Sequence, residues 1–281
     1  MKKIGFIDYY LDEWHANNYP EFIRQQANGE YEVAYAWAQI DSPLPGGMTS
    51  KQWSEKYNIP VLETMDEVIE KSDYLIVLSP DNPEMHEELC KKPLASGKNT
   101  YVDKTFAPDP GAAKRIFEHA DKYGTKCYSS SALFYADEYQ NIKKDGLSVI
   151  NSSGPGTYEM YSIHQIEPIV KLMGTGCAKR IMSVGTKDFP AMIMEYADGR
   201  HVRFCNFPSG APFRMNFGYV DGSTDCSEVT SDFFGACIKN MLRFFETGII
   251  PVSHENTIEV IAIREAGIKA LDNPFTWVDV L

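Results

Sequence analysis

A lysine directly follows an apolar stretch in the sequence TYVDKTF, which spans residues 100–106. Charged groups are costly to bury unless they are paired or used, so a lysine at the end of an interior strand is either a solvated surface residue or a working group. The choice for Lys104 depends on the elements around it. If the apolar stretch is a strand of an open parallel sheet, Asp103 and Lys104 stand at its carboxyl end, where such sheets bind ligands.

The cysteines offer no competing chemistry. The chain has six, and none forms a C-x-x-C motif or stands near a histidine pair at metal-ligand spacing. We therefore expect reduced, mostly packed thiols at these six positions and predict no metal site. The cysteines are Cys90, Cys127, Cys177, Cys205, Cys226 and Cys237.

Length and composition favour a soluble globular chain of two domains. The 281 residues are 43% hydrophobic and 12% aromatic, which is enough to bury a substantial core. A formal net charge of -12 disfavours nucleic acid as a partner, because that binding depends on clustered lysine and arginine. The N-terminal apolar run before Asp8 is too short for a signal peptide or a membrane span. The expected location is cytoplasmic, with no membrane partner.

The first half of the chain alternates short apolar runs with amphipathic stretches, which is typical of βαβ units. This pattern predicts an α/β fold with an N-terminal, Rossmann-like, doubly wound parallel sheet over residues 1–128. The expected strands are 3–7, 32–38, 73–79, 99–103 and 126–131. The expected helices are 15–26, 50–57, 65–72, 82–96 and 109–123.

The pattern changes after about residue 130 and predicts an α+β domain over residues 129–281 with a mainly antiparallel sheet. The sequence ADGR at 197–200 is a plausible hairpin turn between two of the strands. The expected strands are 180–187, 191–199, 201–207 and 213–220. The expected helices are 162–174, 231–248 and 255–271.

Four stretches carry a resemblance to a known family. They are DEVIEKSDYLIVLSPDNPEMHEEL, ASGKNTYVDKTFA, AAKRIFEHADKYG and MYSIHQIEPIVKLMG. In this order and spacing the chain resembles the Gfo/Idh/MocA family of NAD(P)-dependent oxidoreductases over nearly its whole length. The second stretch matches the family's Glu-Lys-Pro signature, and the fourth matches the segment that opens its second domain.

The resemblance implies hydride transfer between a nicotinamide cofactor and a hydroxyl or carbonyl of a small polar substrate such as a sugar, cyclitol or sugar acid. It implies that Lys104 lies beside the nicotinamide and the substrate, where an ammonium group orients an oxygen and stabilises its developing charge. It implies that His164 transfers the proton. The plain alternative is that Lys104 is a solvated strand-end lysine and that His164 is a helix N-terminal histidine satisfied by backbone.

The resemblance also implies the residues that line the two ligands. The expected cofactor-binding residues are Asp8, Tyr9, Trp37, Ser79, Pro80, Asn82, His86 and Asp103. The expected substrate residues are His15, Ser131, Tyr161 and Glu167. NAD is favoured over NADP because no arginine or lysine follows Trp37 closely enough to bind a 2′-phosphate. The alternative for residues 79–86 is a proline-rich helix start capped by Asn82, and the alternative for Glu167 is a surface charge pair.

The sequence departs from the family pattern at the first turn. The glycine-rich fingerprint G-x-G-x-x-G is absent, and the stretch GFIDYYLDEWHA carries three carboxylates at a helix start instead. These would repel a pyrophosphate, although they suit the helix dipole as caps. Thr105 also replaces the signature proline, and Met160 stands where the family has an aspartate. The departures motivate the alternative of a non-catalytic metabolite- or cofactor-binding protein. In either case we expect a homodimer or homotetramer that associates through the second-domain sheet.

Overall fold

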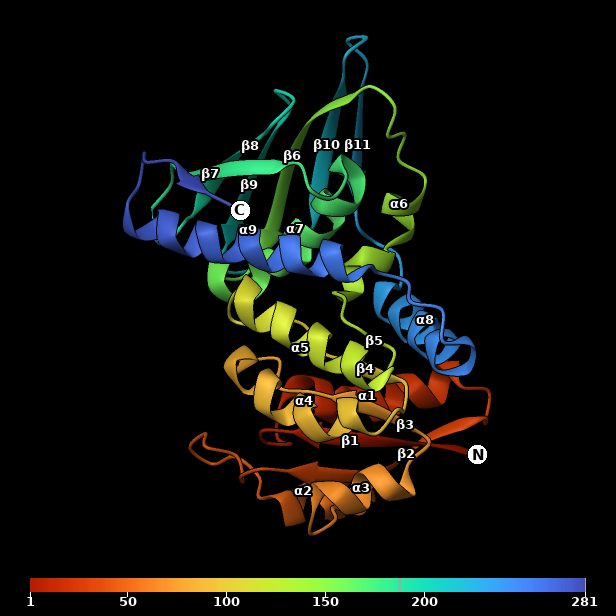
Figure 1. The fold of residues 1–281 in the computed structure, drawn as a ribbon. Helices are drawn as coiled ribbons and strands as arrows, with labels where there is room; N and C mark the ends of the chain where they lie inside the picture. The colour runs from red at the N-terminus through yellow and green to blue at the C-terminus, as the bar shows by residue number, and fades with distance from the viewer. Residues whose placement is uncertain (187, 281) are drawn as a thin grey trace. The chain divides into compact units, whose positions relative to one another are not determined.

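The computed structural model describes residues 1–186 and 188–280. Within them the chain forms two compact units (Figure 1). Unit 1 comprises Met1–Ser130 and Phe234–Ser253, and unit 2 comprises Ser131–Phe233 and the chain from His254 onward. Residues 234–253, which the sequence pattern assigned to the second domain, therefore group with the first unit. Residue 187, the last residue of the strand expected over 180–187, lies outside the described residues.

Unit 1 is built on a parallel sheet of five strands in the order β2-β1-β3-β4-β5. The strands are β1 (Lys2–Asp8), β2 (Tyr31–Ala38), β3 (Tyr74–Val77), β4 (Thr100–Val102) and β5 (Cys127–Tyr128). The predicted doubly wound parallel sheet is confirmed. Because the chain goes from β1 to one side of the sheet and later returns to the other, the gap between the carboxyl ends of β1 and β3 is the topological switch point.

The helices of the first half begin and end where local chemistry predicts. They are α1 (Trp14–Gln26), α2 (Ser50–Tyr57), α3 (Met65–Lys71), the short 3₁₀ helix η1 (Pro83–Met85), α4 (His86–Ala95) and α5 (Pro110–Tyr123). Thr49 and Thr64 form capping boxes with glutamine and glutamate three residues later. Asp109 caps α5, which ends at Gly124 in the left-handed region. The helix expected over 82–96 begins with the 3₁₀ turn of η1, and the α-helix itself begins only at His86.

Gly5 explains how closely β1 approaches its covering helix. A β-carbon added there would lie 2.5 Å from Ser72 Oγ and 2.6 Å from Val68 Cγ1, which is closer than atoms can pack. The one glycine near the first turn therefore serves the packing of α3 on β1 rather than a ligand. The side chains of Ile4, Phe6 and Ile7 on the same strand are fully buried and form part of the core of unit 1.

Helix α8 (Phe233–Thr247) packs into unit 1 although it lies late in the sequence. The ring centroid of Phe234 lies 5.0 Å from that of Trp14, so α8, drawn in blue, contacts α1 (Figure 1). Phe245 stacks on Tyr74 of β3 with ring centroids 4.9 Å apart, and the Asn99 side chain donates to the Phe245 carbonyl at 3.0 Å. These contacts cover the sheet with aromatic surface from α8.

Unit 2 contains a sheet of seven strands in the order β11-β10-β6-β9-β8-β7-β12. The strands are β6 (Leu147–Pro155), β7 (Ala178–Ser183), β8 (Ala191–Tyr196), β9 (His201–Phe207), β10 (Arg214–Tyr219), β11 (Thr224–Glu228) and β12 (Val278–Asp279). Only the β6–β9 pair is parallel, so the prediction of a mainly antiparallel sheet is confirmed. The predicted turn at 197–200 joins β8 to β9, with Gly199 at φ +88°.

Two long helices, α7 (Tyr158–Met173) and α9 (His254–Asp272), pack on each other and on this sheet. Their approach is close at Gly267, where an added β-carbon would lie 1.7 Å from the Tyr158 hydroxyl oxygen. Helix α7 begins four residues earlier than predicted because Thr157 caps it. Short elements η2 (Ala132–Tyr135) and α6 (Asp137–Gln140) precede β6.

Candidate functional site

The switch point of unit 1 carries a buried, charged cluster. Asp8 ends β1, Asp103 follows β4, and Glu13 and His15 begin α1. All four side chains are at least nine-tenths buried, although three of them are carboxylates. We refer to Asp8, Glu13, His15 and Asp103 as the switch-point cluster. Because buried charges persist only when they are paired or used, this cluster is the first candidate for a functional site in unit 1.

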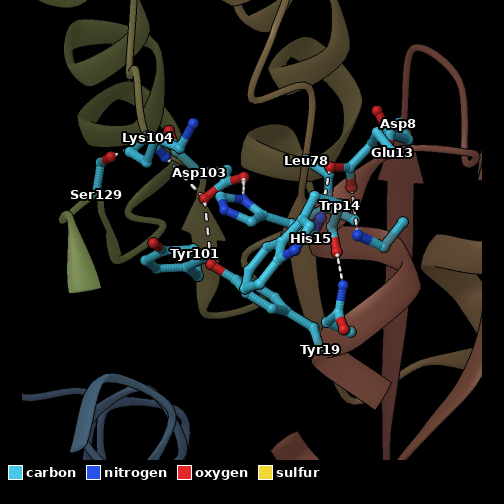
Figure 2. A network of polar contacts seen from close by, with 12 residues as sticks. Asp8, Glu13, Trp14, His15, Tyr19, Leu78, Tyr101, Asp103, Lys104 and Ser129 are labelled. Atoms are coloured by element: carbon cyan, nitrogen blue, oxygen red, sulfur yellow. Dashed lines mark hydrogen bonds and ion pairs between the residues drawn. The ribbon is translucent and has the colours of Figure 1, made fainter. Parts of the chain in front are cut away.

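Asp103 is the centre of the cluster (Figure 2). One of its carboxylate oxygens forms an ion pair with Nδ1 of His15, and the other accepts a hydrogen bond from the Lys104 backbone amide at 2.8 Å. The His15 ring stacks on Tyr19, with centroids 4.8 Å apart. Burial alone would raise the pKa of Asp103, but the neighbouring His15 and Lys104 hold it below its usual value. Asp103 is therefore a stable carboxylate that fixes the backbone next to Lys104.

Lys104 itself lies at the rim of this arrangement. It is half-buried, and within the described residues its ammonium group makes no hydrogen bond or salt bridge. The peptide bond to Thr105 is cis. A cation that leaves water without gaining an internal partner is well suited to bind an oxygen of a ligand.

Glu13 is the N-cap residue of α1. Its carboxylate accepts the backbone N–H of His15 at 2.6 Å and also that of Ala16, so it caps the helix. Burial and the carboxylate of Asp103 raise the pKa of Glu13 well above its usual range. Asp12, the other acid of this turn, accepts the Met48 amide at 2.7 Å and ties the 41–48 loop to α1. Both acids thus have structural partners in the described chain.

Asp8 is less well satisfied. One carboxylate oxygen accepts the Tyr9 amide at 2.7 Å, but the other is buried with no hydrogen-bond partner among the described residues. Burial and the negative charge of Glu13 raise the pKa of Asp8 well above its usual value. The turn therefore presents carboxylates where a Rossmann fold ordinarily presents glycine backbone to a pyrophosphate. These residues do not fit a cofactor phosphate at the start of α1.

The loop after β3 has the backbone strain that is common at ligand sites. Ser79 adopts φ +98°, a conformation that costs a non-glycine residue about 1–3 kcal/mol. Its hydroxyl donates to the Asn82 carbonyl at 3.0 Å and closes the loop around Pro80. Asn82 does not cap the following helix, because its side chain donates to Glu84 at 2.9 Å instead. Asn82 stands at the N-cap position before Pro83, as the alternative for residues 79–86 expected, but its side chain makes no capping hydrogen bond.

His86 lies beneath this loop and is fully buried. Its ring nitrogens lie 2.7 Å from the Leu78 carbonyl and 3.1 Å from the Phe106 carbonyl. Burial lowers its pKa, although the nearby Asp103 and the backbone carbonyls oppose this shift. The ring joins the end of β3 to the segment after β4. That position supports the rim structurally, and a direct contact of His86 with a cofactor stays a prediction.

Trp37, near the end of β2, lines a pocket of about 520 Å³ with residues of α3 and α4. The pocket contains the ion pair between Lys92 and Asp66, whose atoms lie 2.6 Å apart, and another lysine, Lys91, paired with Glu88. Both lysines thus have carboxylate partners. The pocket offers an aromatic face and paired charges rather than a free cationic group.

Unit 2 carries a second cluster of the predicted residues. Nδ1 of His164 lies 2.6 Å from the Ser131 hydroxyl, and the backbone N–H of Ser131 donates to the Glu167 carboxylate. The ring of Tyr161, which is exposed, meets the His164 ring edge-on at 5.4 Å. Glu167 was expected to touch His164 or to form a surface charge pair. The surface charge pair is wrong, because Glu167 is buried, and a contact of Glu167 with His164 stays a prediction.

Burial raises the pKa of Glu167 to about 8, against a usual value of 4.5. Between these values the folded chain keeps a proton that the unfolded chain has released, so stability falls as pH rises from 5 to 8. We expect Glu167→Gln to remove up to about 1 kcal/mol per pH unit of this slope. Urea unfolding at several pH values measures it. Glu159→Gln, an exposed change on the same helix, should keep the wild-type slope; equal slopes for all three proteins would contradict the prediction.

The predicted site residues thus fall into two groups. Asp8, His15, Asp103 and Lys104 come together in unit 1, and Ser131, Tyr161, His164 and Glu167 come together in unit 2. Lys104 and His164 belong to different units, so their joint action stays a prediction. Sequence reasoning did not select Glu13 and Tyr19 as site residues. An acid immediately before the apolar pattern of α1 was a signal for Glu13, but Tyr19 looked like an ordinary core residue.

The described residues lack two further features, a metal-ligand cluster and a membrane-spanning helix. They contain no group of three or more histidine, cysteine, aspartate or glutamate side chains that could hold a metal ion. None of their helices is long and apolar enough to cross a membrane.

The parallel sheet with its switch-point cluster defines a Rossmann-like, nucleotide-binding class of fold. Comparison with solved structures agrees. The chain is similar to a probable dehydrogenase from Thermotoga maritima, with a TM-score of 0.80 and 13% identity over 99% of this chain and 98% of that one. It is also similar to scyllo-inositol dehydrogenase from Lactobacillus casei, solved with NAD(H) and scyllo-inositol, with a TM-score of 0.77 and 13% identity over 99% of both chains.

Residues 44–131 match the family model GFO_IDH_MocA, described as an oxidoreductase family with an NAD-binding Rossmann fold. The match covers less than half of the chain and lies almost wholly in unit 1. An uncharacterized oxidoreductase of Schizosaccharomyces pombe is 33% identical over 97 residues, which are 34% of this chain and 24% of that protein. A second one from the same organism is 28% identical over 129 residues, which are 46% of this chain and 31% of that protein. The matched segments thus cover less than a third of these relatives.

Proposed function

We propose that the chain is an oxidoreductase that transfers hydride between a nicotinamide cofactor and a hydroxyl or carbonyl carbon of a small polar substrate. The observation that carries this proposal is the half-buried ammonium of Lys104, which makes no hydrogen bond or salt bridge among the described residues. It lies at the switch-point rim of a unit that matches an NAD-binding oxidoreductase family over residues 44–131. The nicotinamide, when bound, supplies or accepts the hydride. Lys104 binds the reacting oxygen and stabilises its negative charge.

The remaining roles follow from the contacts of each residue. Asp103 is a positioning residue, because its carboxylate holds the amide of Lys104 and is itself held by His15. His164 moves the proton to or from the substrate oxygen, and Ser131 orients its ring at Nδ1. Glu167 supports Ser131 through the backbone amide. In this scheme the chain provides one cation to bind the oxygen and one imidazole to exchange the proton.

The substrate class we propose is a cyclitol, a sugar or a sugar acid. The Lactobacillus casei relative binds scyllo-inositol, and a polyol hydroxyl is the group that Lys104 and His164 can serve. NAD is favoured over NADP, because both lysines in the Trp37 pocket are already paired with carboxylates. A 2′-phosphate would have to compete with those pairs.

Titration of the purified protein with NAD, NADH, NADP and NADPH tests the proposal first. We expect NADH to bind more tightly than NADPH and reduction of NAD in the presence of at least one member of a cyclitol and hexose panel. Absence of binding by all four dinucleotides up to about millimolar concentration, which corresponds to roughly 4 kcal/mol of binding free energy, would remove the proposal.

The second candidate is a non-catalytic protein that binds a metabolite or cofactor in the same fold. It is favoured by Glu13, which occupies the start of α1, and by Met160, which stands where the family has an aspartate. The two candidates differ in turnover. A binding protein would retain affinity for a polyol or dinucleotide and form no NADH with any substrate of the panel.

We also propose that the chain forms a homodimer or homotetramer through the outer face of the unit 2 sheet. Strands β8 and β9 alternate buried residues with half-exposed ones such as Ile193 and Cys205, which leaves a partly apolar face. Sedimentation velocity at several concentrations tests this. A monomer at every concentration would refute it.

A further inference from the structure

The start of α1 is the place where a Rossmann fold ordinarily binds the pyrophosphate of a dinucleotide. We propose that the Glu13 carboxylate is an internal substitute for that pyrophosphate and excludes ligand phosphate from this helix. The inference goes beyond the proposed activity, because it holds for a dehydrogenase and for a binding protein alike. It assigns to Glu13 control over which ligands the site accepts.

The backbone donors of α1 are the first support. A helix of 13 residues leaves its first N–H groups without internal partners, and these are the groups that bind phosphate. Here the amides of His15 and Ala16 donate to the Glu13 carboxylate, and the amide of Asn17 donates to the Glu13 carbonyl at 3.0 Å. A phosphate would have to displace the side chain to reach the same donors.

The charge around Glu13 is the second support. Asp8 and Asp103 are buried near it (Figure 2). Burial and Asp103 raise the pKa of Glu13, and burial and Glu13 raise the pKa of Asp8. The pKa of Asp103 is held below its usual value, so its carboxylate is charged. An incoming pyrophosphate would therefore meet an ionised carboxylate in a site with little water, where like charges repel far more strongly than they do in solvent.

The backbone of the turn is the third support. In the fully described stretch Asp8–Glu13 no residue has a positive φ, so the loop does not have the shape that glycines provide. Tyr10 and Leu11 are buried and fill the turn with side chains. The turn is a different structure, built around an internal carboxylate, and not a glycine loop that has merely lost its glycines.

A simple helix cap explains Glu13 less well. Serine, threonine, aspartate and asparagine are the preferred capping residues, and this unit uses Thr49, Thr64 and Asp109 in that role. A glutamate is longer and places its charge further out over the helix end. That is the position a ligand phosphate would take.

The test uses Glu13→Ser, which keeps a capping oxygen and removes the longer acidic side chain, with Asp109→Ser as the matched control on α5. Binding of NADH and of reduced nicotinamide riboside, which lacks the pyrophosphate, is measured by calorimetry for each protein. We expect Glu13→Ser to bind NADH at least about tenfold more tightly than the wild type, with riboside affinity unchanged. Asp109→Ser should match the wild type for both ligands. Circular dichroism and the unfolding midpoint verify that each variant is folded.

Each outcome decides the proposal. A gain for NADH alone supports it, and a gain from an undetectable wild-type affinity supports it while removing the proposed dehydrogenase function. Equal or weaker NADH binding by folded Glu13→Ser overturns it, and so does an equal gain for the riboside or for Asp109→Ser. If Glu13→Ser does not fold, Glu13→Gln replaces it, because its amide keeps an acceptor oxygen of the same reach without the charge. The same NADH criterion then applies.

Discussion

Replacing Lys104 with alanine is expected to lower turnover by about 10²- to 10³-fold while leaving cofactor affinity within a few-fold. The reason is that the Lys104 ammonium makes no hydrogen bond or salt bridge among the described residues, so its donors are available to the substrate oxygen as charge develops there. Steady-state rates on the best substrate of the panel, together with NADH titration, measure the two effects separately. Lys51→Ala, at an 86% exposed lysine side chain, is the control and should leave both unchanged.

His164→Ala should lower turnover by about 10²- to 10⁴-fold if the imidazole carries the proton. The double variant should cost little more than the worse single one, because groups that act on one transition state are strongly non-additive. Additive losses would indicate that the two residues do not serve the same step. Full activity of Lys104→Ala, on a protein shown to be a dehydrogenase, would refute the role proposed for that lysine.

Asp103→Asn is expected to destabilise the fold by about 3 kcal/mol, the lower end of the cost of breaking a buried ion pair. The folded-state pKa of Asp103 lies below its usual value of 3.8. The contribution is therefore fully present above that value and is lost as pH falls through the folded pKa. Urea unfolding at pH 7 and in the acid range measures both effects.

A double-mutant cycle tests whether the lost stability comes from the contact between His15 and Asp103. His15→Ala alone leaves the buried Asp103 carboxylate without its ion-pair partner, so we expect it to be destabilising as well. The two changes together should cost clearly less than their sum, because the contact is lost only once. If the free energies simply add, the His15–Asp103 contact contributes nothing of its own.

The fold could be predicted where hydrophobic pattern and position agree. In β1 the apolar residues Ile4, Phe6 and Ile7 mark a strand buried on both faces, and the alternation with helices then determines a parallel sheet. Strand β6, with the sequence LSVINSSGP, could not be recognised in this way. It lies within the unit 2 sheet, yet its serines and asparagine resemble a loop, because its stability comes from pairing with β9 and β10.

The candidate site was likewise predictable in part. Asp103 and Lys104 follow directly from the position of β4, because a strand end in a parallel sheet has a known edge. The partner of Glu167 did not follow. The Glu167 carboxylate accepts the backbone amide of Ser131, which lies 36 residues earlier in the chain. Contacts of this kind depend on tertiary packing and leave no local pattern.

The path of the chain also constrains how the protein can be made. The polypeptide passes between the units three times, and Phe234–Ser253 returns to unit 1 only after most of unit 2 has been synthesised. A ribosome therefore releases the first five strands long before the helix that covers Tyr74 and Tyr128 exists. A fragment ending at Ser130 would leave those rings without the aromatic partners that α8 provides. To express unit 1 by itself, residues 234–253 should therefore be joined to residues 1–130.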